Sequence, residues 1–127
     1  MKKIINNADL HFEHETWQKE LLFWKDEIKS FQKRLSEIAS RWTDEQVLAR
    51  LEQFQNQFFI HREKINDLLD ETEGHEHIIA MNVNADHDAI DMKGYRHHEE
   101  IREQMESERL IYNDLKKRFF GFLSRYM

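Results

Sequence analysis

The feature that most constrains the fold of this chain is the scarcity of residues that interrupt a helix. Its 127 residues contain no proline and only three glycines. Proline removes a backbone donor, and glycine costs about 1 kcal/mol relative to alanine inside a helix, so a sequence nearly free of both can stay helical over long stretches. We therefore expect helix along almost the whole chain.

Apolar residues recur at alternating steps of four and three, which is the spacing of one side of a helix. Three stretches of the sequence follow this pattern, and the third is polar in its first half and aromatic in its second. The pattern predicts helices at roughly 8–42, 44–82 and 85–126, all within a single domain that spans residues 1–127.

Capping residues mark the two boundaries between these stretches. Thr43 and Gln46 have the spacing of a capping box, whose side chains satisfy free backbone N–H groups at a helix start. Asn84 or Asp86 is the expected cap of the last helix. Because short turns make successive helices antiparallel, we expect an all-α fold, an elongated three-helix bundle with coiled-coil packing.

Composition and charge exclude several classes of protein. A formal net charge of −6 disfavours a nucleic-acid binder. No window holds the roughly 20 apolar residues of a transmembrane segment, and the first residues lack a secretory signal, so we expect a soluble cytoplasmic protein. The absence of cysteine removes thiolate metal sites and cysteine nucleophiles. Phosphate loops, nucleophile elbows and His-Glu-x-x-His motifs are also missing, so whether the protein is an enzyme stays open.

Eight histidines are the remaining candidates for function. In an antiparallel bundle the turns act as mirrors, and a rise of about 1.5 Å per residue then gives the level of each side chain. This reflection places five possible ligands in one layer near one end of the bundle: His11, His14, His75, His98 and Asp91. Imidazole and carboxylate groups suit divalent transition metals. The sequence therefore predicts a site for iron, zinc or copper, and it implies no organic cofactor.

Two glycines, Gly74 and Gly94, fall in the same layer. They leave room for an ion, a water or a small ligand between the helices, or they reflect a close approach of backbones or a break in the second helix. His61 occupies a core position of the second predicted helix, and reflection brings it level with Glu108. A buried imidazole and a buried carboxylate each need a partner, so we expect a structural polar pair that fixes the register of the second and third helices.

Two alternatives to metal binding remain open. Apolar residues beside the core pattern indicate a non-catalytic interaction or scaffold module, which forms a homodimer or holds a partner helix, with structural histidines. These residues are Phe12, Leu22, Phe23, Phe59, Leu69, Tyr95, Leu110 and Phe120. The other alternative is a pH switch, because protonation of all eight histidines moves the formal charge from −6 to about +2.

Overall fold

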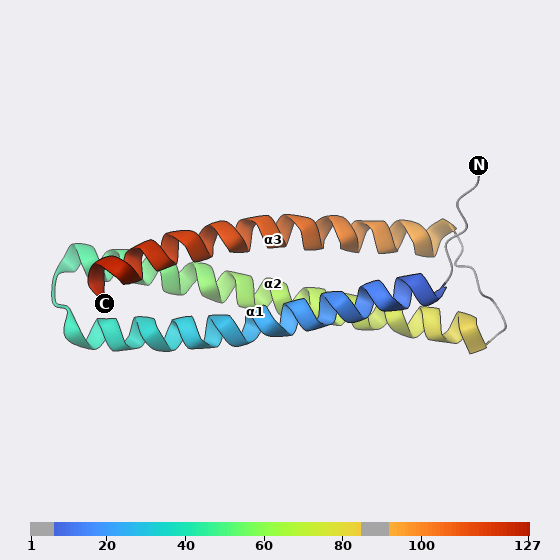
Figure 1. The fold of residues 1–127 in the computed structure, drawn as a ribbon, viewed down its shortest axis with the longest axis horizontal. Coiled ribbons are helices and arrows are strands. Elements are labelled where there is room, and N and C mark those ends of the chain that lie inside the picture. Colours follow the sequence, from blue (N-terminus) through green and yellow to red (C-terminus); the bar gives the residue numbers. More distant parts are fainter. Residues whose placement is uncertain (1–6, 85–91) are drawn as a thin grey trace.

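The computed structural model describes the backbone of residues 7–84 and 92–127, and the side chains of residues 8–77 and 94–127. It contains three long helices, α1 (Asn7–Arg41), α2 (Glu45–Asn84) and α3 (Met92–Tyr126). They lie side by side in an elongated bundle, with α2 antiparallel to both of its neighbours (Figure 1). The all-α, antiparallel three-helix fold is thus confirmed. Within the described ranges, no helix has the length and apolar character that a membrane span requires.

The α1–α2 connection differs from the predicted capping box. The carboxylate of Asp44 accepts hydrogen bonds from the N–H groups of Gln46, at 2.8 Å, and Val47, at 3.3 Å. The Asp44 carbonyl also accepts the first helical bond, from Leu48 at 3.0 Å. Asp44, and not Thr43, is therefore the N-cap, and its negative charge favours this position at the positive end of a helix.

The structure describes only part of the predicted boundary between the second and third helices. Asn84 is the last residue of α2, and α3 is described from Met92 onward. Residues 85–91, which include the alternative cap Asp86 and the start expected for the third helix, lie outside the described part of the chain.

The four-three pattern forms the core of the bundle. Most of its described apolar side chains are almost completely buried, including Leu21 and Ile28 of α1, Phe58 and Ile65 of α2, and Ile101 and Leu115 of α3. Aromatic rings fill the end near the α1–α2 turn, where the centroids of Phe58 and Phe119 lie 5.0 Å apart and those of Phe54 and Phe122 lie 5.2 Å apart. Four of the five buried polar residues, His14, Thr72, His75 and His98, lie toward the opposite end, and the fifth, Glu108, lies near the middle of α3.

A ladder of ion pairs joins the parallel helices α1 and α3. Glutamates seven residues apart on α1 meet cations seven residues apart on α3, and each pair is separated by 89 positions in the sequence. The pairs are Glu13 with Arg102, Glu20 with Arg109 and Glu27 with Lys116, at 2.7, 2.6 and 2.8 Å. The constant separation means that α1 and α3 keep one register over this length, as e and g positions do in a coiled coil.

Candidate metal centre

Three histidines occupy core positions of the four-three pattern, one on each helix. His14 follows Leu10 on α1, His75 follows Leu68 and Thr72 on α2, and His98 precedes Ile101 on α3. Each of the three is at most 1% exposed. We refer to His14, His75 and His98 as the histidine triad. Because each helix turns its core-facing side inward, the three imidazoles meet between the helices.

One nitrogen from each ring faces the centre of the triad. His14 Nε2 lies 2.9 Å from His98 Nδ1 and 3.1 Å from His75 Nδ1. One ring nitrogen from each of the three histidines can be chosen so that all three lie within 4.8 Å of one another, an arrangement that can hold a metal ion. Nitrogen ligands of a tetrahedral zinc ion lie about 3.3 Å apart, given bonds of about 2.0–2.1 Å. Small side-chain movements would therefore bring the ring nitrogens to the spacing found around a bound ion.

The outward nitrogen of each triad histidine has a hydrogen-bond acceptor. His75 Nε2 donates to the carbonyl of Gly94 at 3.0 Å, and His14 Nδ1 donates to Glu76 Oε2 at 2.8 Å. His98 Nε2 contacts the carboxylate of Glu13. A carbonyl or carboxylate oxygen accepts and does not donate, so the outward nitrogens carry the protons. In the neutral rings, the three inward nitrogens then present lone pairs to one another.

Burial favours these neutral rings. It lowers the pKa of His14, His75 and His98, because a charged imidazole loses hydration inside the bundle. The other imidazoles lower these pKa values further, whereas Glu76 and Glu13 act in the opposite direction on His14 and His98. Lone pairs about 3 Å apart repel unless a cation lies between them, which can be a shared proton or a metal ion.

A tryptophan fixes one side of the triad. The ring of Trp17 stacks on that of His98, with centroids 4.9 Å apart, and it lies 5.4 Å from His14. The neighbouring Thr72 is buried but donates its hydroxyl to the Leu68 carbonyl at 2.7 Å, within its own helix. The polar centre is therefore made by the imidazoles, with a rigid aromatic wall beside them.

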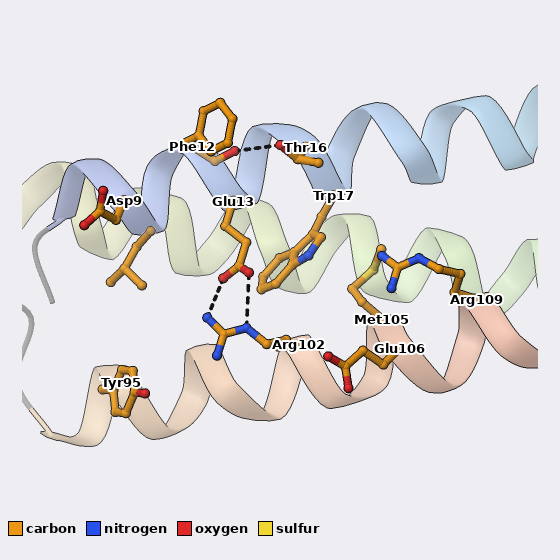
Figure 2. A pocket seen from close by; sticks show the side chains of 11 residues that line it. Asp9, Phe12, Glu13, Thr16, Trp17, Tyr95, Arg102, Met105, Glu106 and Arg109 are labelled. Atoms are coloured by element: carbon orange, nitrogen blue, oxygen red, sulfur yellow. Dashed lines mark hydrogen bonds and ion pairs between the residues drawn. The ribbon is translucent and has the colours of Figure 1, made fainter. Parts of the chain in front are cut away.

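An elongated pocket of about 620 Å³ lies between α1 and α3 next to the triad. Figure 2 shows Glu13 and Arg102 meeting across this pocket, with Trp17 beside them. Burial opposes ionisation of Glu13, but hydrogen bonds from Arg102 and His98 lower its pKa. Glu13 is thus a carboxylate held by His98 on its inner side and by a guanidinium on its outer side.

The other predicted ligands have different positions. His11 is half exposed, and its ring nitrogens face Glu76 and Glu15 rather than the centre of the triad. Asp91 lies outside the described residues. Gly74 is exposed, and no described atom beyond its chain neighbours and its own helix backbone lies within 4 Å of the place that a side chain would take, so it makes no room for an ion between the helices.

Two residues of this site were missed from the sequence, Glu13 and Glu76. Each directly adjoins a triad histidine in the chain, and that adjacency is the signal that was available. Glu13 and Glu76 do not belong to the four-three pattern, and they reach the histidines from the flanks of their helices. His61 and Glu108 do contact each other, with both side chains largely buried. Their role in helix register stays a prediction.

No family model, curated protein or solved structure matches this chain. The geometry of the triad is therefore the basis for inferring a function.

Proposed function

We propose that this protein binds a single transition-metal ion through His14 Nε2, His75 Nδ1 and His98 Nδ1. The observation that carries the proposal is the fixed orientation of the rings. Their outward N–H groups are committed to Glu76, Gly94 and Glu13, so their inward lone pairs converge. Histidines that bind metals in proteins commonly have such an acceptor on the other ring nitrogen, which fixes the tautomer and increases the basicity of the ligand.

The ligand set favours iron, zinc or copper over magnesium or calcium. Three imidazoles are nitrogen ligands of intermediate softness, whereas magnesium and calcium prefer oxygen. The negative charges of Glu13 and Glu76 lie just outside the ligands and help to stabilise a divalent ion. Three protein ligands also leave a coordination position for water or another small ligand, as in sites where zinc is catalytic.

The test is a calorimetric titration of chelator-treated protein with zinc, copper(II) and iron(II). We expect one ion per chain, and at least a hundredfold loss of affinity in each of His14→Ala, His75→Ala and His98→Ala. His77→Ala is the matched control, since His77 is an exposed histidine of the same helix as His75. Circular dichroism checks that every variant stays helical. Equal affinity in the triad variants and the control would contradict the proposal.

A second candidate function is favoured by one observation. Six of the eight apolar residues expected beside the core are between 48% and 73% exposed, namely Phe12, Leu22, Phe23, Phe59, Leu110 and Phe120. Such side chains suit an interaction module that pairs with a second copy or with a partner helix. Wild-type protein that stays metal-free in all three titrations would leave this function in place of metal binding.

A further inference from the structure

Two exposed isoleucines lie near the middle of the surface that α2 and α3 form together. Ile60 of α2 is 62% exposed, and Ile111 of α3 is 54% exposed. The side chains of Lys64 and Gln104 meet across these two helices at 3.3 Å. Ile60 comes four residues before Lys64, and Ile111 comes seven residues after Gln104, so both isoleucines share the sides of their helices that flank the α2–α3 groove. We refer to this surface as the α2–α3 face.

An acidic depression lies on one side of the isoleucines. Its volume is about 400 Å³, and it is lined by Lys64, Glu100, Glu103, Gln104, Ser107, Glu108 and Ile111. Glu108 is buried and contacts His61. Glu100 and Glu103 are exposed to solvent. Because three carboxylates accompany one cation in this lining, the depression carries negative charge.

A basic depression lies on the other side of the isoleucines, toward the α1–α2 turn. Its volume is about 300 Å³, and it is lined by Arg50, Gln53, Phe54, Gln57, Arg118, Gly121 and Phe122. Among these described residues there is no carboxylate. The guanidinium of Arg50 lies 5.6 Å from the centre of the Phe122 ring. Arg118 also pairs with Asp114 of its own helix at 3.0 Å, but both side chains are exposed and such a pair is weak.

The two depressions are evenly spaced about Ile111. Glu100 comes eleven residues before Ile111, and Phe122, the ring that Arg50 covers, comes eleven residues after it. Each lies about 17 Å from Ile111 along the helix, at a rise of about 1.5 Å per residue. A two-fold axis that runs across the face at Ile111, perpendicular to the helices, therefore brings the basic depression of one copy level with the acidic depression of another.

We propose that a second copy of this chain docks antiparallel on the α2–α3 face. Ile60 and Ile111 of both copies lie at the centre of this interface, and opposite charges meet at both of its ends. The face measures about 33 Å from Glu100 to Phe122 and about 20 Å across two helices, so each copy buries about 650 Å². The total passes the roughly 1,000 Å² that a specific interface needs. This inference gives the interaction module considered above a definite partner and face, and it does not depend on metal binding.

Sedimentation velocity over a range of protein concentrations tests the centre of the interface. We expect the wild type to dimerise and Ile111→Asp to raise the dimer dissociation constant about thirtyfold or more, because it buries unpaired charges beside the two-fold axis. Leu22→Asp is the matched control, since Leu22 is 53% exposed but lies on α1, outside this face. Circular dichroism checks that both variants stay helical. Equal or greater weakening in Leu22→Asp overturns the proposed face.

Charge reversal tests the antiparallel orientation. One double variant combines Glu100→Arg with Glu103→Arg, and the other combines Arg50→Glu with Arg118→Glu. Alone, each variant sets like charges against each other at both ends of the interface, so we expect its dimer to weaken about tenfold or more near physiological ionic strength. A mixture of the two restores opposite charges at both ends and should form a heterodimer of nearly wild-type affinity, which native mass spectrometry identifies by its mass.

Three outcomes overturn the inference. The first is a wild type that stays monomeric at millimolar concentration. The second is a wild-type dimer that survives both charge reversals, and the third is a mixture of the double variants that forms no heterodimer. In each case the titrations with zinc, copper(II) and iron(II) still decide metal binding by the triad, so the two proposals fail separately.

Discussion

The histidines at the end of the bundle opposite the α1–α2 turn have pKa values shifted in opposite directions. Burial lowers the pKa of each triad histidine below the usual 6.5. His11 is different, because the hydrogen bond with Glu76 raises its pKa. A lowered histidine pKa means that the unfolded chain binds protons more readily than the folded one, so stability is lost as pH falls below about 6.5. A raised pKa contributes stability below 6.5 that is lost as pH rises through the folded value.

For the metal-free protein, the three buried histidines should outweigh exposed His11, whose interactions are screened by water. We expect the melting temperature to fall by several degrees between pH 7.5 and pH 5, since about 1 kcal/mol moves the melting point of a domain of this size by roughly 3–6 °C. Thermal melts followed by circular dichroism measure this. A melting temperature that is constant, or higher at pH 5, would show that the triad is not buried in its neutral form.

Residue by residue, the sequence led to the triad but not to the groups that orient it. His14, His75 and His98 stand at positions of the four-three pattern, so their inward placement and approximate level follow from helical geometry. Glu13 and Glu76 lie beside that pattern on the flanks of their helices, where glutamate is usually solvated. Which of the many flanking glutamates reaches inward depends on how the helices are rotated about their axes, and apolar spacing alone does not fix that rotation.

At the scale of the helices, reflection through the turns predicts the contacts between α2 and α3 correctly, but it misplaces the contacts between α1 and α2 along the helix axis. Contacts of His61 with Glu108 and of Lys64 with Gln104 lie where a turn centred near residue 84 puts them. Between α1 and α2, reflection about residue 43 places His14 level with Thr72, whereas His14 meets His75, three positions further along the chain. Side-chain interdigitation sets the axial offset of two packed helices, and it need not coincide with the midpoint of the turn.

The ion-pair ladder fixes the parallel register of α1 and α3, and a charge swap tests it. Glu20→Arg alone sets two guanidinium groups against each other, so we expect it to lower the free energy of unfolding by about 1 kcal/mol. Adding Arg109→Glu restores the pair in reverse and should recover most of the loss. Urea unfolding of both single variants and the double variant measures the coupling. If the double variant is as unstable as the sum of the singles, the two side chains do not interact.

Across the whole molecule, the two ends of the bundle differ in the side chains that fill them. Aromatic rings hold the helices together near the α1–α2 turn, whereas one imidazole from each helix meets at the other end. An ion bound there links all three helices and stabilises only the folded chain, by about 2.7 kcal/mol when its free concentration is a hundred times the dissociation constant. Helical periodicity predicted this overall division, but the ligand atoms emerge only once three rings are placed together.

The most direct measurement of the central claim is X-ray absorption spectroscopy of the protein loaded with one zinc ion per chain. Binding by His14, His75 and His98 predicts three imidazole nitrogens at about 2.0–2.1 Å, with one further light atom completing the coordination. The same spectrum for His75→Ala should lose one imidazole or the ion altogether. A shell of oxygen atoms without imidazole scattering would instead place the zinc on surface carboxylates and contradict the account.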